Sequence, residues 1–176
     1  IKAIDFIKSR SHSEAIEAAI FSAKNIDSTV AIILDSQDWL IDRAILLPTN
    51  RELIIDGCRL KLADGVFDNI IRVAGLIPNI DDPNGQCITR HPTKNFKIKG
   101  LNGAVLEGPD VPYMTNNPKT GVYEKWVGDF FGWRTVGILI SGASNYEISN
   151  LTLQKMQCWA ISQDQSSYGY LHDLVI

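Results

Sequence analysis

One pair of acidic residues in this sequence is close enough for two carboxyl groups to act together in catalysis. Asp81 and Asp82 are the only adjacent acids in the chain. Hydrolysis of a glycosidic bond needs two carboxyl groups, one to protonate the leaving oxygen and one to activate water or attack the sugar. The pair lies in the stretch "NIDDPNG", however, and Asp-Pro-Asn-Gly is typical of a turn. We therefore interpret this pair as a turn and expect no catalytic role for it.

Aromatic residues gather in the stretch Val111–Trp133, which includes Tyr123, Trp126 and Trp133. Flat aromatic faces between polar and Gly residues can bind sugar rings, and Arg134 is available for a carboxylate. These four residues are the predicted substrate-binding residues. The alternative is that the aromatic rings fold back as a satellite core, because many exposed rings would make an adhesive surface.

Composition excludes several functions. The net charge of −3 gives no reason to expect nucleic acid as a partner, and no apolar run approaches the ~20 residues of a membrane span. The three cysteines are far apart and form no CxxC or Cys/His cluster. We therefore predict no metal, no cofactor, no nucleic-acid partner and no membrane span.

The elements that must position these residues are one helix and many short strands. The stretch "SHSEAIEAAIFSAK" places Ser11 three residues before Glu14, the capping-box spacing, and repeats apolar residues on one face. This predicts a helix over Glu14–Lys24. Beyond it, short β-like runs are broken by Gly, Asn, Asp and Pro, which indicates an all-β architecture with one helix attached.

A short repeat favours one architecture among the all-β folds. Four copies of a strand–bend–strand pattern begin at Ile55, Ile98, Ile148 and Leu171, and the third place is always Gly, Asn or Asp. These residues reach positive φ at the least cost, so each copy predicts a sharp bend between two strands. The spacings fit a coil of roughly 22 residues, in the range of solenoid repeats. We predict a right-handed parallel β-helix capped by the helix, with a β-sandwich as the structural alternative.

The same residues resemble a known family. "SEAIEAAIFSAK", followed by "DWLIDRAILLPTNRELIIDGCRLKL", is similar to the entry region of the pectate-lyase-like right-handed β-helix superfamily. "VGILISGASNYEISNLTLQKMQCWAISQDQSSYGYLHDLVI" resembles the stretch that precedes the catalytic coils of polygalacturonase-like glycoside hydrolases. The segment 109–134 has no counterpart in that pattern and is expected to be an insertion loop. The resemblance makes Asp164, just past a strand of the expected binding face, a candidate substrate-contacting or catalytic acid, with a solvated turn as the alternative.

The resemblance also implies a function. Polygalacturonases carry Asn-Thr-Asp, Asp-Asp, Gly-His-Gly and Arg-x-Lys segments after this point. Asn-Thr-Asp and Gly-His-Gly do not occur in this sequence, and its Asp81-Asp82 pair and Arg59-Leu60-Lys61 stretch precede the region that resembles this group. We therefore expect residues 1–176 to be one β-helix domain from the N-terminal part of a longer, extracellular or periplasmic polysaccharide-degrading hydrolase. Its catalytic carboxylates would lie on missing downstream coils, and its partner would be a polysaccharide or oligosaccharide, including one that contains uronic acid. The alternatives are a lyase or epimerase of the same fold, and a non-catalytic stem such as a phage tailspike or adhesin.

Overall fold

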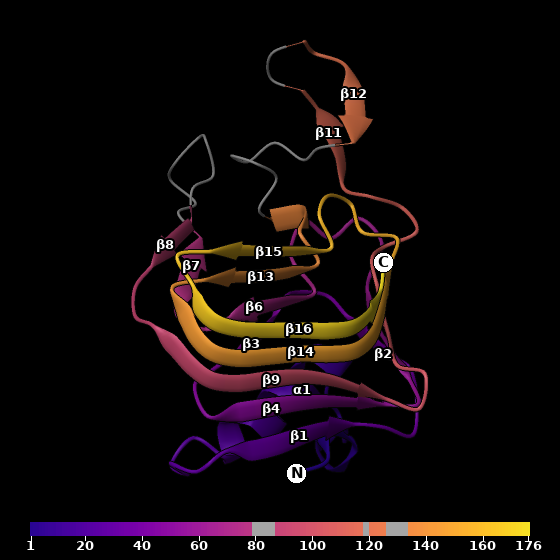
Figure 1. Ribbon diagram of the computed structural model, residues 1–176. Helices are drawn as coiled ribbons and strands as arrows, with labels where there is room; N and C mark the ends of the chain where they lie inside the picture. The colour runs from indigo at the N-terminus through magenta and orange to yellow at the C-terminus, as the bar shows by residue number, and fades with distance from the viewer. Residues whose placement is uncertain (79–86, 118–119, 126–133) are drawn as a thin grey trace.

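The described part of the protein consists mainly of β-strands, with one α-helix at an end of the layered strands (Figure 1). The computed structural model describes residues 1–78, 87–117, 120–125 and 134–176. The helix α1 (His12–Ser22) follows a short 3-10 helix, η1 (Ala3–Phe6). Its capping box is present, since the Glu14 amide donates to Ser11 Oγ at 3.3 Å and the Ser11 amide donates to Glu14 Oε2 at 2.8 Å. The predicted helix is confirmed, and its observed bounds lie two residues earlier than expected at each end.

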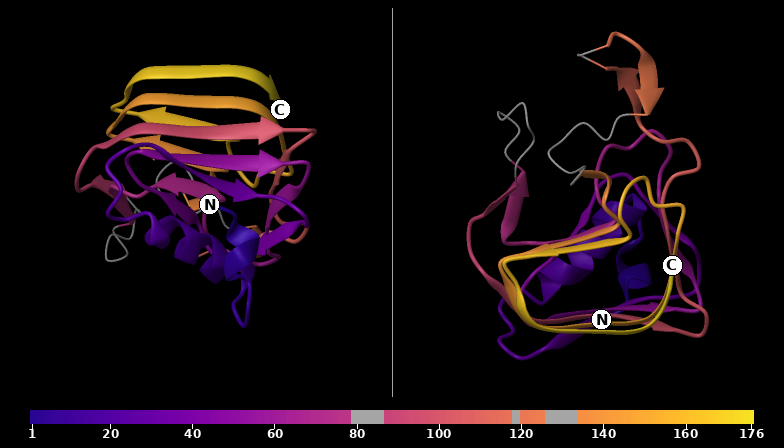
Figure 2. Two further views of the ribbon diagram at one scale, coloured as in Figure 1. Left: turned by 90° about the horizontal axis from the view of Figure 1, so that it is seen from below. Right: turned by 45° about the horizontal axis from the view of Figure 1, so that its top comes forward.

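A curled parallel sheet forms the larger part of the molecule. One arm contains the strands β1 (Val30–Leu34), β4 (Arg51–Asp56), β9 (Thr93–Leu101), β14 (Ala143–Gln154) and β16 (Ser167–Val175). The other arm contains β2 (Trp39–Ile41), β5 (Arg59–Leu62) and β10 (Val105–Glu107), which pairs with the second half of β14. Because β14 belongs to both arms, the sheet curves around the core (Figure 2).

A second parallel sheet faces the first across the core. It contains β3 (Ile45–Leu47), β6 (Ile71–Val73), β13 (Ile138–Ser141) and β15 (Ile161–Asp164). The chain passes from β1 through β2 to β3 and then returns to β4, beside β1. Each return adds parallel strands next to those of the preceding pass, so the passes lie in layers (Figure 1).

The core consists of rows of apolar side chains that run across the stacked strands. One row joins Ile32, Leu53, Ile98 and Ile148, and all four side chains are fully or almost fully buried. Burying one such side chain stabilises the fold by roughly 1.5–3 kcal/mol. The helix covers one end of these rows with Ile16, which is completely buried. The prediction that α1 shields apolar strand residues is therefore confirmed.

The bends between strands agree with the repeat at three places out of four. Gly57, Asn150 and Asp173 have φ of 60°, 56° and 53°, as expected. In the remaining copy the bend is made by Asn102 (φ 50°) and Gly103 (φ 80°), and not by Gly100. In the observed register Ile98 pairs with Ile148, as aligned, but with Leu53 rather than with Ile55, so the first and second copies are offset by two residues.

A ladder of asparagines marks a bend at the start of β4, β9 and β14. Asn50, Asn95 and Asn145 all have positive φ, between 54° and 59°. The Asn145 amide donates to Asn95 Oδ1 at 2.7 Å, and the Asn95 amide donates to Asn50 Oδ1 at 3.1 Å. Asparagine tolerates this backbone conformation and its side chain links one layer to the next, so a single residue type serves both needs.

Two antiparallel hairpins lie outside the parallel sheets. The strands β7 (Leu76–Pro78) and β8 (Cys87–Thr89) form one, and β11 (Met114–Asn116) and β12 (Tyr123–Lys125) form the other. The second hairpin lies within the predicted insertion 109–134 and projects beyond the layered strands (Figure 1).

Candidate functional site

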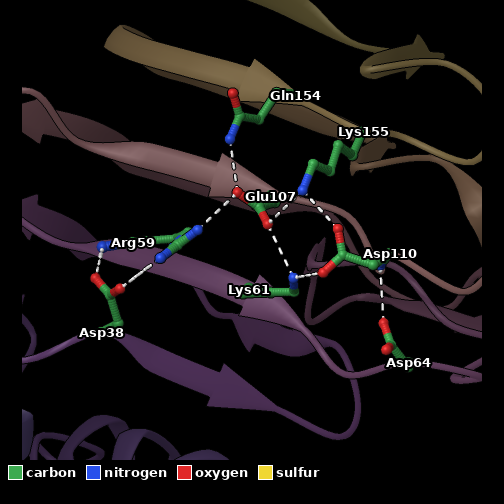
Figure 3. A network of polar contacts seen from close by, with 8 residues as sticks. All are labelled: Asp38, Arg59, Lys61, Asp64, Glu107, Asp110, Gln154 and Lys155. Atoms are coloured by element: carbon green, nitrogen blue, oxygen red, sulfur yellow. Dashed lines mark hydrogen bonds and ion pairs between the residues drawn. The ribbon is translucent and has the colours of Figure 1, made fainter.

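A carboxylate at the end of β10 is the centre of the densest polar network that the structure describes. Glu107 faces outward between its neighbours in register, Lys61 on β5 and Gln154 on β14. Its side chain is 1% exposed. It accepts hydrogen bonds from Lys61 Nζ at 2.9 Å and Gln154 Nε2 at 2.6 Å. Arg59 and Lys155 add bonds at 3.1 and 3.3 Å (Figure 3).

Acidic residues around this network balance its cations. Asp110 accepts from Lys61 and Lys155, and Asp38 accepts from the Arg59 guanidinium at 2.9 Å. Asp64 lies at the edge, where it accepts from the backbone amide of Asp110 (Figure 3). The cluster therefore joins β5, β10 and the end of β14 by alternating charges.

The electrostatics of Glu107 exclude a role as a general acid. Burial acts to raise its pKa, but hydrogen bonds from Lys61, Gln154 and the other donors outweigh burial and lower the pKa to about 2. A general acid for hydrolysis at neutral pH needs a raised pKa. Glu107 stays ionised, so we interpret this network as a clamp across three strands.

A second polar cluster, which we call the charged face, lies on the outer side of β4, β9, β14 and β16. It consists of Glu52, Lys97, Lys99, Glu147, Tyr170 and His172. Lys97 Nζ lies 3.1 Å and Lys99 Nζ 3.9 Å from the Glu147 carboxylate, and His172 Nε2 lies 3.4 Å from it. Glu147 is thus surrounded by three groups that carry or can carry a positive charge.

Two residues of the charged face have shifted pKa values. Burial acts to raise the pKa of Glu147, but hydrogen bonds from Lys97 and Ser149 lower it overall. The hydrogen bond to Asp173 raises the pKa of His172, with a further contribution from Glu147. Protonated His172 is therefore favoured next to ionised Glu147, and the face keeps both signs of charge.

A shallow hollow beside the charged face presents aromatic rings to solvent. It has a volume of about 290 Å³, and its lining includes Asn145, Lys97, Glu147, Tyr168 and Tyr170. The Tyr168 side chain is 86% exposed and that of Tyr170 is 64% exposed. The Tyr170 ring stacks on His172 with centroids 4.4 Å apart, which fixes its orientation. The two tyrosine rings, the Asn145 amide and the Lys97 ammonium together form a surface that can bind a sugar ring and a carboxylate.

The residues that the sequence predicted as site residues do not meet in one place. Asp164 ends β15 beside Ser141 of β13 and is exposed. Tyr123 is 66% exposed on the projecting β12. The Arg134 guanidinium lies over the Phe67 ring at 5.0 Å, in the manner of the satellite packing that we considered as the alternative.

Two further predicted residues, Trp126 and Trp133, lie outside the described residues, as does the acidic pair Asp81-Asp82. Another aromatic of the segment, Tyr113, stacks on Phe67 with ring centroids 4.9 Å apart. The described part of the aromatic stretch thus contains both a packed portion and an exposed hairpin.

The sequence prediction did not find the charged face. The sequence feature that indicates this face is the two-residue spacing of polar side chains in long strands, because residues two apart lie on the same side of a strand. Lys97 and Lys99 share one side of β9 in this way, and Tyr170 and His172 share one side of β16. Recognising it also requires the register, because Glu147 joins the set only through its pairing with Lys97 and Tyr170.

Comparison with known proteins identifies no relative: no family model, no curated protein and no solved structure matches the chain. Within the described part of the chain, no group of three or more His, Cys, Asp or Glu side chains is placed to hold a metal ion. No described helix is both long and apolar enough to span a membrane.

Proposed function

We propose that this chain belongs to a right-handed parallel β-helix protein that degrades a polysaccharide, in the manner of polygalacturonase-like glycoside hydrolases. The layered parallel sheets, the asparagine ladder and the covering helix support the fold part of the proposal. In such a solenoid, each coil buries the apolar face of the next. The sequence resemblance to the polygalacturonase-like group supports the choice of enzyme class.

The exposed pair Tyr168 and Tyr170, beside Lys97, is the observation that carries the substrate assignment. A polysaccharide repeats its rings along an extended chain, and the layered strands repeat their outward side chains in the same way. The two tyrosines offer faces for sugar rings, and the Lys97 ammonium, which is paired with Glu147, offers further hydrogen-bond donors for the carboxylate of a uronic acid. The substrate class is therefore a polysaccharide or oligosaccharide with acidic sugar units.

The proposal assigns the catalytic acids to positions outside the described residues. Hydrolysis needs one carboxyl group with a raised pKa, and each described Asp or Glu for which a shift is resolved has a lowered one. The charged face is accordingly proposed to bind and orient the substrate, and Asp164, at the end of β15, remains a separate candidate for a substrate contact.

Binding of an acidic oligosaccharide tests the substrate assignment. Titration of the full chain with an oligogalacturonide should give saturable binding, and a neutral oligosaccharide of equal length should bind more weakly. We expect Tyr170→Ala and Lys97→Ala each to weaken binding about tenfold, which corresponds to ~1.4 kcal/mol. Tyr123→Ala is the matched variant, since Tyr123 has a similarly exposed ring on β12.

Three outcomes would change the assignment. A loss in Tyr123→Ala but not in Tyr170→Ala would move the binding surface to the hairpin. Equal affinity for neutral and acidic sugars would remove the role of Lys97. No binding to either sugar would reject the substrate assignment altogether.

Product analysis after incubation with the polysaccharide separates the enzyme classes. A hydrolase yields new reducing ends without an unsaturated sugar, whereas a lyase yields an absorbing unsaturated product. A non-catalytic stem would give no turnover and would sediment as a trimer. A stem is expected to have an apolar outer face, and the alternating charges of Lys97, Glu147 and Glu52 favour the enzyme instead.

A further inference from the structure

A cavity of about 470 Å³ lies between α1 and the strands β3 and β4. It shares no lining residue with the hollow of the charged face. One wall is apolar and includes Ile20, Phe21, Leu46 and Ala74. Phe21 is 64% and Leu46 41% exposed, so the wall is open to a ligand. The volume is typical of a small-molecule site.

The lining of the cavity also includes a buried guanidinium, which has no acidic partner among the described residues. Arg51 is 4% exposed and lines the cavity. It donates to the carbonyl oxygens of Asn50 at 2.6 Å, Ile26 at 3.3 Å and Ala23. Within the described part of the chain, its Nε has no hydrogen-bond partner and its charge has no carboxylate. Ala23 is the C-cap of α1, so the carbonyl groups at this helix end partly balance the charge, but no carboxylate among the described residues neutralises it.

Other charged groups leave the cavity positive. Lys24 lines it, with Nζ 3.9 Å from the Phe21 ring centroid, and His91 adds ring nitrogens. Glu17 is the one acidic residue of the lining. Both of its oxygens are taken by the Arg43 guanidinium, at 2.8 and 2.7 Å, so it does not neutralise Arg51 or Lys24.

We infer that this cavity is a binding site for a small carboxylate with an aromatic or short alkyl body. The carboxylate pairs with Lys24, within the field of Arg51, and the body packs against the adjacent Phe21 and Leu46. This ligand supplies the negative charge that the described residues lack and covers apolar surface that is otherwise exposed. The inference is independent of the proposed polysaccharide function.

Calorimetric titration with three probes tests the chemistry of the ligand. With the full chain at neutral pH, 3-phenylpropionate should bind at least tenfold more tightly than 3-phenylpropan-1-ol, which has the body without the charge. Acetate has the charge without the body and should bind as weakly as the alcohol. Equal binding of acid and alcohol, or no binding of 3-phenylpropionate at millimolar concentration, would overturn the inference.

Matched variants test the location. Lys24→Gln and Leu46→Gln should each weaken 3-phenylpropionate about tenfold, and both positions are exposed enough for the variants to fold. Lys8→Gln makes the same charge change at an exposed position that does not line the cavity, and it should leave the affinity within twofold. An equal loss in Lys8→Gln and Lys24→Gln would show general electrostatic attraction and reject the site.

Discussion

At the scale of single residues, Glu107 links stability to pH. Its pKa lies at about 2 in the folded protein and near 4.5 in the unfolded chain, so the stabilisation is present above pH ~4.5 and is lost as the pH falls through 2. A shift of this size corresponds to about 3 kcal/mol. We expect Glu107→Gln to lower the free energy of unfolding by about 2–3 kcal/mol at pH 7 and by much less at pH 2.5, measured by urea unfolding.

The control for this prediction is Glu124→Gln, at an exposed position on β12. It should change stability by less than about 0.5 kcal/mol at either pH, as expected for an exposed charge. The same loss at both pH values in Glu107→Gln would mean that packing of the side chain, and not its ionisation, stabilises the three strands.

Asn95 combines backbone and side-chain roles that two substitutions can separate. Asn95→Gly keeps the freedom for its φ of 54° but removes the hydrogen bonds to Asn50 and from Asn145. Asn95→Ala removes the bonds and adds strain of about 1–2 kcal/mol. We therefore expect thermal melts to rank the proteins wild type, Asn95→Gly, Asn95→Ala in falling order. Equal melting temperatures for the two variants would show that the bend is not strained.

At the scale of elements, the helix α1 provides a direct test of its covering role. Ile16 is fully buried against the strands, whereas Phe21 on the same helix is 64% exposed. Ile16→Ala should lower the free energy of unfolding by about 2–5 kcal/mol, because it removes buried apolar groups and leaves a cavity. Phe21→Ala should cost less than about 1 kcal/mol. Similar losses in denaturant unfolding would mean that the helix does not seal the core.

The elements that sequence analysis predicted well are those with local signals. The capping box at Ser11 and Glu14 depends on residues three apart, and the helix is where it indicates. The stretches that begin at Tyr146 and Gly169 share one pattern because their strands lie in register, 23 residues apart. All four bends have a local turn residue within two positions of the prediction.

The prediction of a bend at Gly100 was wrong for a physical reason. A Cβ at Gly100 would lie 1.9 Å from the Asn150 carbonyl oxygen, so this glycine permits a close approach of two backbones instead of a bend. Glycine serves both purposes, and one sequence does not distinguish them. The charged face was missed for a related reason, since the pairing of Glu147 with Lys97 is a long-range register that no local pattern contains.

At the scale of the whole molecule, stability should be unevenly distributed. The strand β9 pairs on both sides, with β4 and β14, and contributes the buried Phe96 and Ile98 to the core. The hairpin β11–β12 is a two-stranded sheet whose second strand is exposed throughout. Isolated two-stranded hairpins are marginally stable in water, and segments with few buried contacts open locally at low free energy.

Amide hydrogen exchange measures this difference along the chain. We expect the backbone amides of β9 to exchange only through large-scale unfolding, and those of Met114–Asn116 and Tyr123–Lys125 to exchange at least a hundredfold faster, through local opening. Removing the hydrogen bond from Lys125 Nζ to the Gln157 carbonyl, by Lys125→Met, should accelerate exchange in the hairpin and leave β9 unchanged. If the hairpin were protected as strongly as β9, it would belong to the same cooperative unit as the layered strands. The exposed Tyr123 would then be held as rigidly as Tyr170.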